Sequence, residues 1–246
     1  MILARISRAI RQQNWFAVAL EFIIVIAGVV IGFQVTAWNA NRTDQVRVDQ
    51  AIERLQLEAE QNIVALRQRI ASSEVRATER AIMVDIAAGG ELEDAHHAAF
   101  ERAVAQLMYF SQIPVQRSTY QALEQSGDLA LITDSELIIE LNQYQEGVDW
   151  VESQHAGFRG GLTSFSGVLG QFVFHEPTDD PTRTRARIDL DLLAEDARRR
   201  SALVQVARMH SIFDSYVISL EARTMAFCDR LALETGRACN VEEDAP

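Results

Sequence analysis

Histidines and carboxylates are the side chains of this sequence that could do acid–base or metal chemistry. Glu93 and His97 stand four residues apart, so on a helix they would present two metal ligands on one face. No third ligand follows at a metal-binding spacing, and we therefore interpret the pair as solvated helix surface. A second group, interpreted as a solvated acidic loop rather than a cation site, comprises His175, Glu176, Asp179 and Asp180.

Two further histidines, His155 and His210, fall on apolar seams of predicted helices. They could face each other as a buried polar layer that sets helix register, or as a pH-sensitive pair. We favour ordinary core histidines whose ring nitrogens are satisfied by hydrogen bonds.

The sequence contains no glycine-rich phosphate loop, nucleophile elbow, zinc pattern or paired-carboxylate motif. The glycines between residues 157 and 170 have no strand before them, so they do not form a nucleotide loop. We expect no enzymatic activity, no metal and no cofactor.

The two cysteines, Cys228 and Cys239, lie on either side of Gly236, a residue that can turn the chain back at a helix end. The spacing predicts a disulfide, which would fit an oxidising compartment. The alternative is two unrelated thiols, one of them buried on a helix.

An apolar segment over residues 15–38 predicts a transmembrane helix, because about twenty apolar residues span a bilayer. Trp15 and Trp38 stand at its ends, where aromatic rings settle among lipid headgroups. A cleavable signal peptide is the rival interpretation, but the segment is longer than such peptides need and Trp38 and Ala40 make a poor cleavage site.

Glu21 is the charged residue of this segment, and a charge within a span indicates function by default. The alternative is that Glu21 lies shallow and reaches the headgroups. Gly28 and Gly32 form a GxxxG pair on the same helix face, which predicts a homo-oligomeric contact or a contact with another membrane protein. The complete predicted face consists of Ala17, Glu21, Val25, Gly28, Gly32 and Thr36.

Charge predicts how the chain crosses the bilayer. The amphipathic stretch 1–14 carries Arg5, Arg8 and Arg11, against Arg42 and Arg47 just after the span. This bias places residues 1–14 in the cytoplasm and the domain outside, in the periplasm if the membrane is a bacterial inner membrane.

The domain beyond residue 38 is acidic, with 20 arginines against 34 carboxylates and a net charge of −14. Such a domain would repel nucleic acid, so we expect no nucleic-acid partner. Every one of the 23 basic residues is arginine, which we interpret as the mark of a GC-rich bacterial genome.

Apolar periodicity predicts an all-α fold, in which the transmembrane helix continues into an elongated antiparallel four-helix bundle over residues 39–235. The first bundle helix would extend to Gly89-Gly90, and the second would cover Leu92 to Phe110. A short capped helix, from Ser118 to Gly127, completes the second. No strand is expected, and an acidic tail covers residues 236–246.

The third helix would open with a capping box at Thr133 and Glu136 and continue to Phe172. It could instead break near Gly160-Gly161, because glycine weakens helices. The fourth would cover Leu192 to Glu234, after a loop at Pro177–Pro181. A stripe of small residues on the third helix, which would let a neighbouring backbone come close, comprises Ser153, Gly157, Gly160, Ser164 and Gly167.

Two segments together resemble an uncharacterised bacterial family of single-span, membrane-anchored helical proteins, known only as a domain of unknown function. In the anchor the similar residues are Glu21, Gly28, Gln34, Trp38 and Asn39. In the segment STYQALEQSGDLALITDSEL they are Thr119, Tyr120, Leu123, Ser126, Gly127, Leu129, Ile132 and Leu137. The resemblance covers about a fifth of the chain. It implies the anchor and the helical domain, and it supplies no activity.

We therefore expect a non-catalytic membrane accessory or scaffold protein that acts through helix–helix contacts. The alternative is an extracytoplasmic ligand-sensing bundle that needs a separate output partner. A pocket lined by convergent polar groups would favour the sensor, and a filled core with an exposed apolar stripe would favour the scaffold.

Overall fold

The computed structural model describes residues 15–180 and 184–241. The predicted amphipathic stretch 1–14, Pro181 at the end of the predicted loop, and residues 242–246 of the tail lie outside the described residues. About 80% of the chain is helical, which confirms the all-α class. The chain divides into two units, one up to Gln50 and one from Ala51 onward.

The first unit consists of the N-terminal part of α2 (Trp15–Ala87). Its apolar stretch is long enough to cross a membrane, and none of it is buried within the described chain, unlike a core helix of a soluble protein. A signal sequence near the N-terminus can also satisfy this criterion of length and hydropathy. By length and composition, this helix could span a bilayer.

The second unit is built on three long helices: α2 from Ala51 onward, α5 (Ser135–Leu169) and α7 (Ala197–Thr235). The apolar seam predicted for the last helix is buried along its whole length, which confirms that prediction. Its members are Leu203, Val206, His210, Phe213, Val217, Leu220, Thr224, Phe227 and Leu231. The seams of α2 and α5 are buried over most of their length as well.

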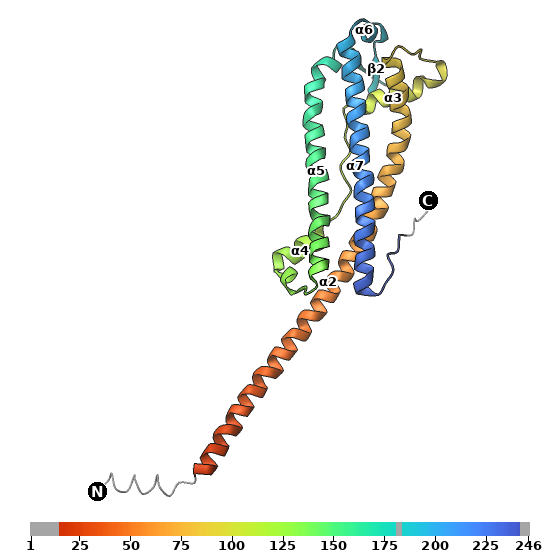
Figure 1. Cartoon of the computed structure of the whole chain (residues 1–246). Helices are drawn as coiled ribbons and strands as arrows, with labels where there is room; N and C mark the ends of the chain where they lie inside the picture. The colour runs from red at the N-terminus through yellow and green to blue at the C-terminus, as the bar shows by residue number, and fades with distance from the viewer. Residues whose placement is uncertain (1–14, 181–183, 242–246) are drawn as a thin grey trace, which may run out of the picture. The chain divides into compact units, whose positions relative to one another are not determined.

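Helices α5 and α7 lie side by side and antiparallel, as Figure 1 shows. Tyr144 stacks on Phe227 with ring centroids 4.6 Å apart, and Phe158 contacts Phe213 at 5.9 Å. Residue numbers that increase along α5 therefore pair with residue numbers that decrease along α7, as in an antiparallel pair. Ion pairs join α2 to α7 in the same sense, with Arg67 on Glu221 and Arg80 on Asp214. Helices α2 and α5 therefore run in the same direction.

The chain returns between α2 and α5 through short helices and irregular segments, so the predicted helix over Leu92–Phe110 is wrong in length. The structure has a single 3-10 turn, η1 (Asp94–His96), and the ten-residue α3 (His97–Gln106). Residues 107 and 108 form a turn, and residues 109–117, which we call the extended segment, form neither helix nor strand. Two main-chain carbonyls there, of Leu107 and Phe110, are bonded by histidine rings instead of by helical N–H groups.

Helix α4 (Ser118–Ser126) follows this extended segment and ends at Gly127, whose φ of 78° is left-handed, as the sequence predicts. The 3-10 turn η2 (Asp128–Leu131) leads to α5. The capping residue of α5 is Asp134 and not Thr133, since its carboxylate accepts from the N–H groups of Glu136 and Leu137.

A two-stranded hairpin interrupts the helical pattern, which corrects the expectation of no strand. Strand β1 (Val173–Pro177) pairs antiparallel with β2 (Thr184–Ile188), so Pro177 belongs to a strand and not to a loop. Ala186 of β2 is buried beside α3, while Arg187 pairs with Glu176 across the hairpin. Helix α5 ends at Leu169, and it continues through Gly160-Gly161 without a break.

The last predicted helix is divided. Helix α6 (Leu190–Glu195) is capped by Asp189, and α7 begins at Ala197 because Asp196 accepts from the N–H of Arg198 and caps a new helix. Gly236, with a φ of 66°, ends α7 as predicted.

Candidate functional site

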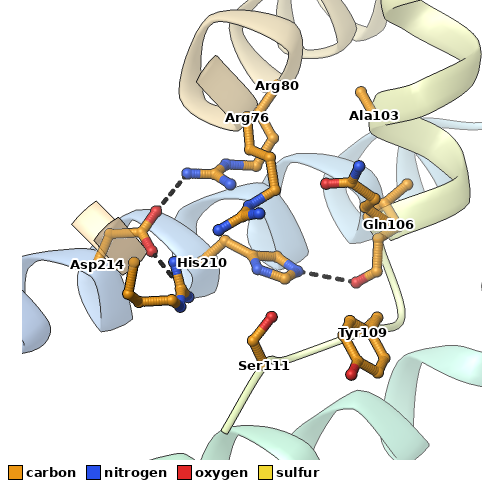
Figure 2. A pocket seen from close by; sticks show the side chains of 10 residues that line it. Arg76, Arg80, Ala103, Gln106, Tyr109, Ser111, His210 and Asp214 are labelled. Atoms are coloured by element: carbon orange, nitrogen blue, oxygen red, sulfur yellow. Dashed lines mark hydrogen bonds and ion pairs between the residues drawn. The ribbon is translucent and has the colours of Figure 1, made fainter. Parts of the chain in front are cut away.

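A cavity of about 230 Å³ lies in the second unit, among α2, α7, α3 and the residues that follow α3 (Figure 2). Its charged and amide side chains converge from three elements, and we call this set the arginine pocket. The set consists of Arg69, Arg76, Arg80, Gln106, His210 and Asp214. Tyr109 and Ser111, from the extended segment, complete the wall.

Helix α2 brings its three arginines to one side, because residues spaced by seven and four positions keep to one helix face. The adjoining stripe of α2 is apolar, with Leu66 and Met83 fully buried. Arginine can lay its methylene stem along such a surface and carry its charge beyond it. The guanidiniums of Arg69, Arg76 and Arg80 therefore meet at the edge of the core.

Asp214 of α7 is shared by two of these guanidiniums. One carboxylate oxygen accepts from Arg80 Nη2 at 2.5 Å, and the other accepts from Arg69 Nη2 at 3.4 Å. The three side chains are 10% to 13% exposed. With Arg76 added, three positive charges face one negative charge, a local net of +2 in a domain whose net charge is −14.

Several donors in the pocket have no protein partner among the described residues. They are Arg69 Nε and Nη1, Arg76 Nη2 and Arg80 Nε, all of them buried. The amide oxygen of Gln106 is likewise buried without a donor. A buried polar group that lacks a hydrogen bond costs about 1 to 3 kcal/mol, and more when it is charged. The pocket therefore holds a surplus of hydrogen-bonding capacity that its own side chains do not use.

Burial also acts on the charged state of Arg69. Desolvation lowers the pKa of its guanidinium, Asp214 opposes that shift, and the neighbouring charge of Arg76 adds to it. Arginine remains protonated in proteins nonetheless, so this guanidinium stays charged in a site that desolvates it. An added negative charge would stabilise all three guanidiniums.

His210 forms the floor of the pocket beside Asp214. Its Nε2 lies 2.9 Å from the carbonyl oxygen of Leu107, and because a carbonyl only accepts, Nε2 carries the proton. The ring stacks on Phe110 at a centroid distance of 4.0 Å. Burial lowers the pKa of His210, so the ring is neutral in the folded chain at neutral pH.

His155 holds the same extended segment from the opposite helix. Its Nε2 lies 3.3 Å from the carbonyl oxygen of Phe110, and its ring is 5.3 Å from that of Phe213. Each of the two seam histidines thus satisfies one ring nitrogen, Nε2, on a main-chain carbonyl, as expected for core histidines. They fix residues 107–110, which carry one wall of the arginine pocket.

The residues of the predicted intramembrane face all lie in the N-terminal part of α2. Among the described residues, no atom lies within 4 Å of a Cβ built at Gly28 or Gly32. The hydroxyl of Thr36 donates to the carbonyl oxygen of Gly32, 3.0 Å away in its own helix. The described chain therefore contributes nothing to the close approach that the two glycines permit.

The disulfide predicted between Cys228 and Cys239 is present, with the two Cα atoms 5.8 Å apart. Beyond Gly236 the chain turns back against α2. Glu60 there accepts from Arg237 at 2.9 Å and from the N–H of Asn240 at 2.8 Å. The disulfide and Glu60 together hold residues 237–240 onto the bundle.

Glu58 and Asn62, on the side of α2 opposite Glu60, hold the segment that enters α4. Glu58 accepts from the hydroxyls of Ser118 and Thr119 and from the N–H of Thr119, so it compensates the first N–H groups of the helix. Asn62 bonds both the N–H and the carbonyl of Gln116. Ser118 was expected to cap α4, whereas its side chain makes no cap bond there and donates to Glu58.

The other predicted chemical groups lie apart from the pocket. His97 is 56% exposed and 3.8 Å from Asp94, as a surface residue would be. His175 is exposed on β1. The pocket arginines, Gln106 and Asp214 were not recognised in the sequence, although the seven- and four-residue spacing of Arg69, Arg76 and Arg80 beside an apolar stripe was a readable signal.

Comparison of the chain with protein-family models, with curated proteins and with solved structures finds no match. The function has to be inferred from the site itself.

Proposed function

We propose that this chain is a membrane-anchored, non-catalytic receptor whose helical domain binds a small anion in the arginine pocket. One observation carries the proposal: three guanidiniums line a pocket that holds a single carboxylate, which pairs with only two of them, and four of their buried nitrogens have no protein partner in the described part of the chain. Buried charge of one sign is normally compensated, and a bound anion would compensate it here.

This geometry favours the ligand-sensing alternative over the scaffold first expected from the sequence. A scaffold needs a filled core and an exposed contact surface, and neither calls for convergent buried donors. Guanidiniums at neutral pH neither give nor take protons, so they suit binding better than turnover. The side chains that line the pocket therefore support binding of a ligand and not catalysis.

The membrane part of the proposal rests on the N-terminal portion of α2 and on the arginine bias around it. We place this portion in a bacterial inner membrane, with residues 1–14 in the cytoplasm and the domain in the periplasm. Such a receptor would pass its state to another membrane protein or to a second copy of itself, through the face that carries Glu21, Gly28 and Gly32.

Thermal unfolding of the full chain in detergent tests anion binding. A ligand present at 100 times its dissociation constant stabilises the folded state by about 2.7 kcal/mol, which raises the midpoint by several degrees. We expect a mixture of phosphate, sulfate and malonate to raise the midpoint of the wild type relative to chloride at equal ionic strength. Arg76→Met should abolish the shift.

Arg208→Met is the matched control, because Arg208 is exposed on α7 and does not line the pocket. It should keep the full anion-dependent shift. Arg76 is the right residue to remove, since no ion pair of the described structure depends on it and the fold should survive. If no anion raises the wild-type midpoint, or if Arg76→Met responds as the wild type does, the proposed function is wrong.

A further inference from the structure

The placement of donors in the arginine pocket points to the shape of the anion. The four buried nitrogens without a protein partner belong to three guanidiniums that leave α2 at three different levels. A carboxylate offers two oxygens in one plane, and the pocket already holds one, Asp214, between Arg69 and Arg80. A tetrahedral oxyanion directs oxygens along four axes and matches donors that come from separate directions.

The acceptors in the same pocket point to a proton on that anion. Asp214 can only accept, and the buried amide oxygen of Gln106 has no donor among the described residues. A ligand without a proton would place its own oxygens beside these acceptors without forming a hydrogen bond. A ligand that carries a P–OH group would donate to one of them.

We infer that the arginine pocket selects a protonated tetrahedral oxyanion, free monohydrogen phosphate, over sulfate, carboxylates and phosphate esters; this inference rests on the proposed anion-binding function. Free phosphate keeps at least one proton at neutral pH. Sulfate has none, the dianion of a phosphate monoester such as a sugar phosphate has lost its last one, and the phosphodiester of a typical lipid headgroup has none either. Selectivity thus comes from the acceptors and affinity from the arginines.

The cavity volume agrees with a small ligand. About 230 Å³ is well above the ~10–15 Å³ that one water needs, and it lies below the ~300–1,000 Å³ of pockets for drug-sized molecules. Phosphate and a few waters would fill it, whereas a phosphate ester with a large organic group would need more room.

Isothermal titration of the full chain in detergent at pH 7.5 compares four probes: inorganic phosphate, sulfate, malonate and glycerol phosphate. We expect phosphate to bind the wild type about tenfold more tightly than each of the others, the effect of one hydrogen bond to a charged group. The wild-type series decides the inference without any variant. If sulfate, malonate or glycerol phosphate binds as tightly as phosphate, the inference is overturned.

Two variants test whether Gln106 and Asp214 cause the preference for phosphate over sulfate. Gln106→Met removes one acceptor and should reduce the preference for phosphate over sulfate several-fold, with sulfate affinity little changed. Asp214→Asn turns the other acceptor into a side chain that can also donate a hydrogen bond. This variant should likewise reduce the preference for phosphate over sulfate. An unchanged preference in both variants would overturn the role of the acceptors. The absence of binding by all four anions would instead reject the proposed function.

Discussion

Burial of His210 makes the stability of the folded chain depend on pH. Desolvation is the largest cause that lowers the pKa of His210, and the charges of Arg80 and Arg69 act in the same direction. The hydrogen bond to the Leu107 carbonyl and the charge of Asp214 oppose this shift. As the pH falls through about 6.5, the ordinary histidine pKa, the unfolded chain takes up a proton before the folded chain does. The stability contributed by the neutral ring is therefore present above about pH 6.5 and is lost as the pH falls toward the folded pKa.

We predict that His210→Gln flattens this pH dependence. Glutamine can still donate to the carbonyl of Leu107, but it does not titrate. Unfolding midpoints measured from pH 5 to pH 8 should fall less steeply toward acid in the variant than in the wild type. His97→Gln is the matched control, because His97 is 56% exposed. Parallel profiles for wild type and His210→Gln would contradict the prediction.

At the same scale, the sequence identifies buried seams better than it identifies the pocket. His155 and His210 were recognisable because an apolar seam has a period that one sequence displays. Arg76 and Asp214 were not, since their meeting depends on how far α7 slides along α2. That register is fixed by contacts more than 130 residues apart, such as Arg80 with Asp214.

Helix α5 contains glycines at positions where alanine would make the helix more stable. Among the described residues, no atom lies within 4 Å of a Cβ built at Gly157 or Gly160. Within the described chain, no backbone therefore packs on this part of the small-residue stripe. We predict that Gly157→Ala and Gly160→Ala each stabilise the protein by about 0.5 to 1 kcal/mol, measured by denaturant unfolding of the full chain.

Gly127→Ala is the opposite case and the control. Its φ of 78° is left-handed, so alanine there should cost about 1 to 2 kcal/mol. Destabilisation by Gly157→Ala would mean that something outside the described chain packs on α5. A neutral Gly127→Ala would mean that the end of α4 relaxes easily.

The disulfide fixes the end of α7 to the segment that turns back. Its loop is short, with a separation of 11 residues, so the chain-entropy contribution is about 2 to 3 kcal/mol. We predict a loss of that size in Cys228→Ala/Cys239→Ala, and a mass change on alkylation of the natively purified protein only after reduction. Two thiols that alkylate without reductant would remove the bond and part of the case for export.

Elements with one long apolar period were predictable, and elements held by side-chain-to-backbone bonds were not. The hairpin has two strands of five residues each, Val173–Pro177 and Thr184–Ile188. Few of their side chains are buried, Ala186 being one, so the sequence shows too little alternation of apolar and polar residues to predict strands. The stretch from Leu107 to Phe110 looks helical in sequence because Val104, Leu107 and Phe110 are spaced by three, whereas the helix ends at Gln106. The carbonyls of Leu107 and Phe110 are taken by His155 and His210, and a single sequence does not show that competition.

At the scale of the whole molecule, the arginine bias predicts on which side of the membrane the domain lies. Protease added to spheroplasts should digest the chain beyond Asn39, because the domain would then be outside the cytoplasm. Lysed spheroplasts provide the control for protease access. Protection in spheroplasts, with digestion only in inverted vesicles, would reverse the topology.

Self-association through the span is the other prediction at this scale. Gly28→Leu and Gly32→Leu should each weaken an oligomer that is captured by cross-linking in native membranes, since leucine prevents two helices from approaching closely. Val30→Leu, two positions from Gly28 and so on the opposite face, should leave it unchanged. If both glycine variants cross-link as the wild type does, this face does not mediate self-association.

The bonds between α2 and the C-terminal segment also set the order in which the protein is completed during synthesis. Gln56 and Glu60 receive their partners from residues 237 and 240, which are made 181 and 180 positions later. At about 5–20 residues per second, that interval lasts roughly 10 to 35 s. Until then Glu60 lacks the partners that the folded chain gives it, so the packing of this part of α2 is completed only after Asn240 has been made.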